Sequence, residues 1–483
     1  MRYRFVVGTV AVAACTALLS GASAAGARLP GATAPGGATS GGTWGGAEEV
    51  PGTAALNQGG NAQVLSVSCG SAGNCSAGGY YHDGSGAGQA FVVSETNGTW
   101  GTAEQVPGTA TLAPGGNAAV TSVSCARAGY CSAGGNYADS SGLRQVFVAS
   151  EKDGVWHSAL EVPGIAALNQ RGNATISTVS CASAGNCSAG GNYLDGSGHT
   201  QAFVVSKVNG TWGTAEEVPG SAALNQGGTA EIISLSCGAA GNCGAGGLYE
   251  DSSGKQHAFV VSEANGVWGN AEEVPGTAEV DSVATSVSCP SAGNCNAAGY
   301  YEDVDNLSQA FVAAETSGAW GLAQEIPMPD LSQRGLASIA VSCGSAASCS
   351  AAGDFQDDSE NQQAFAGTGK KGVWGAEEVP GSAALNQGGT AEISSVSCGS
   401  AGDCSAGGTY ADGSGDQQAL VFSETNGTWG TAEEVPGSAA LNQGGNAVIL
   451  SVSCASADNC SGGGFYKDSS GQLQAFVVNE TGT

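Results

Sequence analysis

The chain has 483 residues and carries 42 acidic against 13 basic side chains, for a formal net charge of −29. An acidity of this size repels nucleic acid and anionic membrane surfaces, so the composition excludes both as general partners. The 17 cysteines favour an oxidising compartment.

Residues 1–24 have the pattern of a secretory signal peptide. A basic start and an apolar stretch lead to the small-residue cleavage site Ala22-Ser23-Ala24. A lipoprotein signal is the alternative, because Val12-Ala13-Ala14-Cys15 resembles a lipobox. Residues 25–43 are rich in glycine, alanine, proline and threonine and predict a flexible linker. We therefore expect export, followed by a folded region at 44–483.

After Cys15, the remaining cysteines form pairs that are six residues apart. An even number of cysteines in an exported chain predicts disulfides. Metal binding is disfavoured, because the chain has four histidines and none recurs at a fixed position. The predicted disulfide cysteines are Cys69/Cys75, Cys125/Cys131, Cys181/Cys187, Cys237/Cys243, Cys289/Cys295, Cys343/Cys349, Cys398/Cys404 and Cys454/Cys460.

The tryptophans mark a repeat of 52 to 56 residues, a period typical of propellers and other repeat arrays. One unit contains four β-like runs, "NAQVLSVSC", "CSAGGYY", "QAFVVSE" and "TWGTAEQV". An Asn-Gly or Asp-Gly pair joins the third run to the fourth in most units, as at Asn97-Gly98, and suits a two-residue hairpin. Each unit is therefore predicted to be a four-stranded antiparallel meander, which is one propeller blade. The tryptophans are Trp44, Trp100, Trp156, Trp212, Trp268, Trp320, Trp374 and Trp429.

The repeat opens on a lone fourth run at Thr43 and closes on a third run at Gln474 that lacks its fourth. The piece that is missing at one end is present at the other. The sequence therefore predicts an all-β, eight-bladed β-propeller whose ring is closed by the N-terminal strand, residues 43–50.

Units that read SVSC-x5-C-x-A-G-G and then QAFVVSE-x-N-G-x-W resemble the Cys-paired, Trp-containing repeats of secreted actinobacterial propeller-like proteins. The resemblance covers residues 44–483. It implies a propeller-like fold and export, and it implies no activity.

Because successive strands alternate in direction, the Cys loops and the Asn-Gly turns are expected on one face of the ring. The "DGSG" turns and the long loops between the fourth and first strands are expected on the other. The long loop reads "PGTAALNQGG" and exceeds what chain reversal requires, so we predict that its face binds the ligand. Its candidate ligand-binding residues, for which loop capping is the alternative, are Asn57, Gln58, Asn169, Gln170, Asn225, Gln226, Asn386, Gln387, Asn442 and Gln443.

Other repeated polar groups have structural interpretations that compete with a binding role. The aspartate of each "DGSG" turn suits capping of its own turn, and the tyrosine two residues earlier suits packing with its hydroxyl satisfied. Paired glutamates such as Glu48-Glu49 lie on the outermost strand, where charge discourages edge pairing. The tryptophans are interpreted as wedges between blades.

The strongest break in the repeat spans residues 279–371, where Asp281, Asp330 and Arg334 replace the usual loop. Asp303 and Asp357 stand in acidic clusters there and are added to the candidate ligand-binding residues. Drift of the repeat is the competing explanation. The chain contains no Ser-His-Asp, HExxH, phosphate-loop or EF-hand pattern, so we name no catalytic residue and no metal or other cofactor.

The sequence predicts an extracellular, monomeric, multivalent binding module for carbohydrate or cell-envelope polymer, without catalysis. Many similar weak sites suit attachment through avidity. The alternatives are a secreted carbohydrate-active enzyme, such as a sialidase-like hydrolase or a lyase, and a scaffold that binds an extracellular protein.

Overall fold

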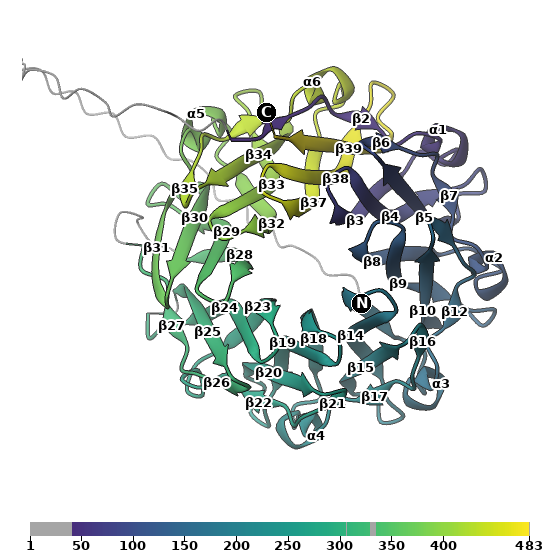
Figure 1. Cartoon of the computed structure of the whole chain (residues 1–483), viewed down its shortest axis with the longest axis vertical. Helices are drawn as coiled ribbons and strands as arrows, with labels where there is room; N and C mark the ends of the chain where they lie inside the picture. The colour runs from purple at the N-terminus through teal and green to yellow at the C-terminus, as the bar shows by residue number, and fades with distance from the viewer. Residues whose placement is uncertain (1–40, 306, 329–334, 483) are drawn as a thin grey trace, which may run out of the picture. The chain divides into compact units, whose positions relative to one another are not determined.

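The computed structural model describes residues 41–305, 307–328 and 335–482. The predicted signal peptide, Cys15 and residues 25–40 of the predicted linker lie outside them, as do Asp330 and Arg334 of the divergent region. Within the described residues, eight antiparallel sheets stand around a common axis (Figure 1). The predicted all-β, eight-bladed propeller is confirmed.

The first four blades follow one another along the chain, each running from its innermost to its outermost strand. Blade 1 contains β3 (Ala62–Ser71), β4 (Asn74–His82), β5 (Gly88–Thr96), β6 (Thr99–Trp100) and β7 (Glu104–Gln105). Blade 2 contains β8 (Ala118–Arg127), β9 (Tyr130–Ala138), β10 (Arg144–Lys152), β11 (Val155–Trp156) and β12 (Leu160–Glu161). Blade 3 contains β13 (Thr175–Ser183), β14 (Asn186–Leu194), β15 (Thr200–Val208), β16 (Thr211–Trp212) and β17 (Glu216–Glu217). Blade 4 contains β18 (Ala230–Ala239), β19 (Asn242–Glu250), β20 (Gln256–Ala264), β21 (Val267–Trp268) and β22 (Glu272–Glu273).

The other four blades repeat the arrangement, and the last takes its outer strands from the start of the chain. Blade 5 contains β23 (Ser282–Ser291), β24 (Asn294–Glu302), β25 (Ser308–Thr316), β26 (Ala319–Trp320) and β27 (Gln324–Glu325). Blade 6 contains β28 (Leu336–Ser345), β29 (Ser348–Gln356), β30 (Gln362–Lys370) and β31 (Val373–Glu378). Blade 7 contains β32 (Ala391–Ser400), β33 (Asp403–Ala411), β34 (Gln417–Thr425), β35 (Thr428–Trp429) and β36 (Glu433–Glu434). Blade 8 contains β37 (Ala447–Ser456), β38 (Asn459–Lys467), β39 (Leu473–Thr481), β1 (Thr43–Trp44) and β2 (Glu48–Glu49).

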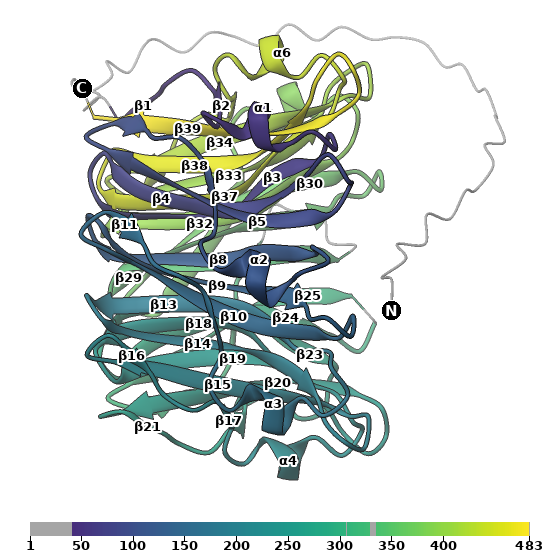
Figure 2. The same ribbon diagram turned by 90° about the vertical axis from the view of Figure 1, so that its right-hand side faces the viewer.

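Six one-turn helices lie in the long loops at the rim of the ring (Figures 1 and 2). Each begins after a glycine in the left-handed region, such as Gly52 with φ 88°, a conformation that favours glycine. No described helix is long and apolar enough to cross a membrane. The helices are α1 (Thr53–Leu56), α2 (Thr109–Leu112), α3 (Ile165–Leu168), α4 (Ser221–Leu224), α5 (Ser382–Leu385) and α6 (Ser438–Leu441).

The fourth strand of the predicted blade is interrupted in every blade except blade 6. In blade 1 the two short pieces β6 and β7 both pair with β5. Between them the Ala103 N–H turns away and donates to the Pro51 carbonyl at the rim of blade 8, at 2.7 Å. In blade 6 the run between Trp374 and Glu377 is one residue shorter, and β31 stays continuous. The interruption therefore hydrogen-bonds one blade to the next.

Two serines of the SVSC motif link the innermost strands of neighbouring blades. The Val123 N–H donates to Ser66 Oγ and the Cys125 N–H donates to Ser68 Oγ, both at 2.9 Å. Equivalent bonds recur between other blades and close the ring from blade 8 to blade 1. The hydroxyls thus satisfy backbone donors that the crowded inner strands would otherwise leave unpaired.

The Ala-Gly-Gly segment of the second strand is explained by close packing. A Cβ on Gly79 would lie 1.9 Å from the Gln63 carbonyl oxygen of the neighbouring strand, and one on Gly78 would lie 2.5 Å from Val120 of the next blade. At the Gly79 position only glycine fits, whereas blades 5 and 6 carry alanine at the Gly78 position. Most of the apolar core lies farther out, where one fully buried aromatic ring or leucine of each third strand, such as Phe91, packs between sheets.

The eight predicted disulfides are present, each within one unit. In blade 1, Cys69 and Cys75 face each other across the innermost strand pair. Closing so short a loop stabilises the fold by about 2 kcal/mol per bridge in the chain-entropy account. The bridges at the same place in the other seven blades are Cys125/Cys131, Cys181/Cys187, Cys237/Cys243, Cys289/Cys295, Cys343/Cys349, Cys398/Cys404 and Cys454/Cys460.

The second cysteine of every pair is buried and belongs to the apolar core between blades. Cys75, for example, is 3 % exposed and packs in the same cluster as Val64 and Phe91. The bridges are therefore structural: these sulfurs fill the core and cannot be reached by a ligand, a burial that the spacing of the cysteines does not predict. The other second cysteines, each in the core cluster of its own blade, are Cys131, Cys187, Cys243, Cys295, Cys349, Cys404 and Cys460.

The ring closes through its ends, as the repeat predicts. Strand β1 pairs with β39 through Thr43 and Thr481, and β2 pairs with the same strand through Glu49 and Phe476. The Trp44 indole N–H donates to Ser423 Oγ of blade 7 at 3.2 Å. The N-terminal strand therefore completes both a sheet and a contact between blades.

Candidate functional site

The asparagines of the predicted binding loops are buried, and their amides are used within the protein. Asn57 is 5 % exposed, and its Nδ2 donates to the Leu473 carbonyl and to Gln474 Oε1, both at 2.9 Å. Its Oδ1 accepts from the Asn61 N–H at 2.7 Å. Asn169, Asn225, Asn386 and Asn442 make the corresponding donations. These are the bonds that the loop-capping alternative requires.

The glutamine beside each of these asparagines is exposed to solvent. Gln58 Nε2 makes a single long contact of 3.4 Å with the Ala55 carbonyl, so most of its hydrogen-bonding capacity faces water. Gln170, Gln226, Gln387 and Gln443 are placed alike. Among the ten candidate residues of the predicted binding loops, these five side chains are the ones that a ligand can reach.

The aspartates of the second turn cap their own loops. Asp83 Oδ1 accepts from the Ser85 N–H at 2.8 Å, and its Oδ2 accepts from Gln89 at 2.8 Å. Hydrogen bonds from the Ser85 hydroxyl and then from Gln89 lower the pKa of Asp83 to about 2. Asp303 and Asp357 of the divergent region make the same two kinds of bond, so their carboxylates face their own turns.

Most of the tyrosines near these turns are buried and donate a hydrogen bond to a glutamate of the outermost strand. Tyr193 donates to Glu217 of its own sheet at 2.8 Å, and Tyr466 donates to Glu49 of the N-terminal strand at 3.1 Å. Burial, with the neighbouring carboxylate, raises the pKa of Tyr193 well above its usual range. The second glutamate of the pair thus has a structural partner that sequence reasoning missed.

On the predicted binding face, two cavities open where the long loop departs from its usual sequence. One of about 440 Å³ lies between blades 1 and 2, beside Tyr80, Asn117 and Arg144. The other, of about 300 Å³, lies between blades 4 and 5 and brings together Asp281 and Glu302 from the divergent region.

The long loop and the second turn share this face, as the alternation of strand direction predicts. In blade 1 the His82 N–H donates to the Asn61 carbonyl at 2.9 Å, and the Gly59 N–H donates to the His82 carbonyl at 2.8 Å. The end of the second strand is therefore bonded directly to the long loop.

The opposite face carries the Cys loops and the Asn-Gly turns, which hydrogen-bond each other, as Gly98 does with Gly73. Here each contact between consecutive blades, which we call a seam, contains a tryptophan wedge. The Trp156 indole N–H of blade 2 donates to Ser94 Oγ of blade 1 at 3.1 Å, and the ring is 6 % exposed. The interpretation of the tryptophans as wedges is confirmed.

A buried carboxyl group accompanies the tryptophan at most seams. Glu151 accepts hydrogen bonds from Ser94 at 2.8 Å and from Ser76 at 3.2 Å, both in the preceding blade. Burial raises the pKa of Glu151, because the charged form is poorly solvated there. The glutamates at this position of the repeat are Glu95, Glu151, Glu263, Glu315, Glu424 and Glu480.

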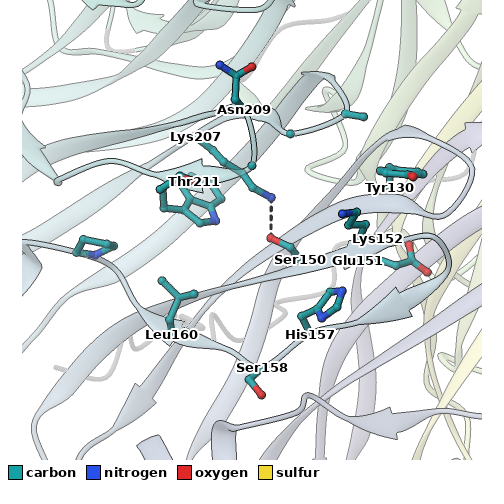
Figure 3. A pocket seen from close by; sticks show the side chains of 15 residues that line it. Tyr130, Ser150, Glu151, Lys152, His157, Ser158, Leu160, Lys207, Asn209 and Thr211 are labelled. Atoms are coloured by element: carbon teal, nitrogen blue, oxygen red, sulfur yellow. Dashed lines mark hydrogen bonds between the residues drawn. The ribbon is translucent and has the colours of Figure 1, made fainter.

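The seam between blades 2 and 3 differs, because it opens into a cavity of about 760 Å³. We call this cavity the seam pocket. Figure 3 shows side chains of blade 2 and blade 3 lining it from opposite sides. The corresponding cavity between blades 1 and 2 has a volume of about 180 Å³. The residues that define the seam pocket are Tyr130, Ser150, Glu151, Lys152, His157, Ser158, Leu160, Pro163, Ala184, Gly185, Lys207, Asn209, Gly210, Thr211 and Trp212.

The seam pocket has an exposed mouth and a buried floor. Lys152, His157 and Asn209 are exposed at the mouth, whereas Lys207 and Trp212 are 6 % and 7 % exposed at the floor. Arg127 covers one face of the Tyr130 ring, with Cζ 3.7 Å from the ring centroid, and the Tyr130 hydroxyl donates to Asp153. The pocket therefore combines fixed aromatic surface with several hydrogen-bonding and cationic groups.

Four lining residues depart from what the repeat carries at the same position. The repeat has mostly asparagine at the position of Tyr130, and glycine after the tryptophan where His157 stands. It has mostly glutamate where Lys207 stands, and glutamate or glutamine where Leu160 stands. Sequence reasoning missed this site because it relied on the longest break in the repeat. A position-by-position comparison of the units carries the signal, since all four departures meet at one seam.

Among the described residues, no group of three or more histidine, cysteine, aspartate or glutamate side chains is arranged to hold a metal ion.

No protein-family model matches the chain, and no curated protein matches its sequence. Solved structures are similar to the chain at low identity and low TM-score. BP39L lectin from Burkholderia pseudomallei is 13 % identical, with a TM-score of 0.44 over 78 % of this chain and 99 % of that one. A polysaccharide lyase, PL25 ulvan lyase, is 10 % identical, with a TM-score of 0.40 over 73 % and 90 %. A protein of unknown function from Dyadobacter fermentans is 8 % identical, with a TM-score of 0.38 over 91 % and 99 %. Likenesses at this level carry no information about the ligand or activity of this chain.

Proposed function

We propose that the chain is an extracellular carbohydrate-binding protein whose principal site is the seam pocket. The observation that carries the proposal is the meeting of four departures from the repeat at one open cavity. Drift of the repeat would scatter such changes over the ring. Extracellular placement is supported by the eight disulfides, which persist in oxidising compartments.

The size and chemistry of the pocket suit a saccharide. A volume of about 760 Å³ is within the range of small-molecule sites. Sugars present an apolar ring face and a rim of hydroxyls. The Tyr130 and Trp212 rings offer apolar surface, and Asn209, Lys152 and His157 offer groups that bond hydroxyls.

The number of carboxyl groups in the pocket favours a binding function over a hydrolytic one. Glycoside hydrolysis generally uses two carboxyl groups that flank the bond. The lining residues include one acid, Glu151, and its oxygens accept hydrogen bonds from Ser76 and Ser94. A carbohydrate-active enzyme would need a second, free carboxylate, and the residues that line the seam pocket do not supply one.

The test is calorimetric titration of the full mature chain with a panel of oligosaccharides. The double variant Tyr130→Asn, His157→Gly restores the residues that most other blades carry, so the fold should survive. We expect at least tenfold weaker binding with an unchanged melting temperature. Asn242→Ala, at the Tyr130 position of blade 4, is the matched control. Equal binding by the double variant, or no binding of any sugar by the native chain, would overturn the proposal.

The exposed glutamines of the repeated loops are still compatible with the prediction of many weak binding sites. Gln58, Gln226 and their equivalents could add weak sites on the other face, as a multivalent module requires. That prediction is independent of the seam pocket, and replacement of the glutamines tests it separately.

A further inference from the structure

Lys207 is a buried cation without a counter-ion among the described residues. Its Nζ donates to Ser150 Oγ at 2.6 Å (Figure 3). It also donates to Ser132 Oγ at 3.0 Å, and both serines belong to the preceding blade. No carboxylate of the described residues lies within 4.0 Å of the ammonium. An ammonium group has three N–H donors, and these two bonds use two of them.

A lone buried charge is costly unless a partner of opposite sign is brought to it. Burial lowers the pKa of Lys207, as expected for an ammonium with no anion beside it. The Trp212 ring, whose centroid lies 5.6 Å from Nζ, offers partial compensation. The compensation that the structure leaves room for is an anion that enters the seam pocket.

Glu151 is the one acidic residue that lines the pocket, and it is not the partner of Lys207. The two carboxyl oxygens of Glu151 accept hydrogen bonds from Ser94 and Ser76 of blade 1, on the side of blade 2 that faces away from Lys207. Burial raises the pKa of Glu151, which favours its neutral form. At the mouth of the pocket, Lys152 adds a positive charge. The wider neighbourhood agrees, because five of the thirteen basic residues of an otherwise acidic chain lie between positions 127 and 207. They are Arg127, Arg144, Lys152, Arg171 and Lys207.

We propose that the seam pocket selects an acidic saccharide and that Lys207 pairs with its carboxylate or sulfate group. The inference rests on the proposed carbohydrate-binding function and names the class of sugar. The aromatic rings would hold the sugar ring, while the ammonium would hold the charged substituent. In six other blades a glutamate stands at the position of Lys207, and its carboxylate would repel the same charged group.

Lys207→Glu is the decisive variant, because it restores the residue of those six blades. The introduced carboxylate can accept from Ser132 and Ser150 as Glu151 accepts from Ser76 and Ser94. Ser150 also becomes free to accept from the Trp212 indole N–H, which has no partner among the described residues, as Ser94 accepts from Trp156. The variant should therefore fold, with a melting temperature equal to or above that of the native chain.

The measurement is the ratio of two affinities, for a uronic-acid oligosaccharide and for its neutral counterpart of equal length. We expect the native chain to prefer the acidic sugar, and Lys207→Glu to lower that preference at least thirtyfold. Lys207→Met, which removes the charge and keeps the volume, should lower it at least tenfold. Lys255→Glu makes the same charge change at an exposed position of blade 4 and should leave the ratio unchanged.

The outcomes separate the two proposals. If no sugar of either kind binds, carbohydrate binding itself fails. If both sugars bind the native chain equally, or if the preference survives in Lys207→Glu, the assignment of Lys207 is overturned while carbohydrate binding stands. Inorganic sulfate is titrated separately. Sulfate that binds as tightly as the acidic sugar would show a simple anion site and would also overturn the inference.

Discussion

The Val67 N–H of blade 1 donates a hydrogen bond to Ser451 Oγ of blade 8 at 3.0 Å, across 384 residues of sequence. The same bond joins Val123 to Ser66 between blades 1 and 2. The seam that closes the ring is therefore built like the seams inside the chain. The inner serines hold it at the axis, and the N-terminal strand holds it at the rim.

Removal of the N-terminal strand should destabilise the whole ring. A truncated chain that begins at Gly52 loses the pairing of Thr43 and Glu49 with β39 and the Trp44 wedge. The buried Glu480 would then lie beside an unpaired strand edge. We expect a lower melting temperature and a single transition, measured by calorimetry. A truncated chain that melts like the native one would show that closure contributes nothing.

Each disulfide should stabilise its own blade modestly. The double variant Cys237→Ala, Cys243→Ala should lower the free energy of unfolding by about 2 kcal/mol, as expected for a short closed loop. Denaturant titration measures the change. Peptide mapping without reduction should place every bridge within one unit, and bridges between units would contradict the blade assignment.

Asn225 and Gln226 stand side by side, yet their replacement should have different effects. Asn225→Ala removes donations to Thr200 and Gln201 and leaves the Gly228 N–H without its acceptor. A loss of about 1–3 kcal/mol in stability follows from the buried unpaired groups. Gln226→Ala should leave the melting temperature unchanged. Thermal unfolding of the two variants compares them, and equal losses would contradict the capping role.

The glutamines also test multivalent attachment. Combined replacement of Gln58, Gln226, Gln387 and Gln443 by alanine keeps the buried asparagines in place. If the repeated loops bind a polymer, avidity on a polysaccharide surface should fall more than for any single change. Unchanged avidity would reject the repeated-site prediction and leave the seam pocket as the candidate.

Asp354 should make the stability of the protein depend on pH in the opposite sense to the turn aspartates such as Asp83. It is 1 % exposed, and burial raises its pKa to about 6 despite bonds from Ser338 and Gln362. Because the folded state holds this proton more tightly, its contribution is present below the unfolded pKa and is lost as the pH rises through about 6. Asp354→Asn should remove this dependence and raise stability at pH 7 by up to about 3 kcal/mol. Melting temperatures between pH 4 and pH 7 measure it, and parallel curves for both proteins would contradict the assignment.

The fold could be predicted because local signals repeat eight times. The alternation of the runs, the turn chemistry at pairs such as Asn97-Gly98 and the complementary ends define the blade and the ring. The interrupted fourth strand could not be predicted, because it depends on a bond from Ala103 to Pro51 of another blade. Nothing in the local sequence of β6 and β7 indicates that partner.

The site was harder to predict for a related reason. Lys207 and Ser132 are 75 residues apart and meet only when consecutive blades are stacked. The pattern of Asn57 and its equivalents is equally compatible with a ligand site and a loop cap, because burial is what separates the two. The departures at Tyr130 and His157 are single residues within well-preserved units, whereas the sequence prediction rested on whole rewritten loops.

The pairing of Thr481 with Thr43 has a consequence for the order of the chain. In blade 1 the equivalent residues, Thr96 and Thr99, flank the Asn97-Gly98 turn. Thr481 and Thr43 are thus as close as the two sides of a tight hairpin, with no covalent turn between them. A circular permutant that joins them by Asn-Gly and opens instead at Asn426-Gly427 would contain the same eight sheets. The closed ring therefore does not depend on which blade comes first in the chain.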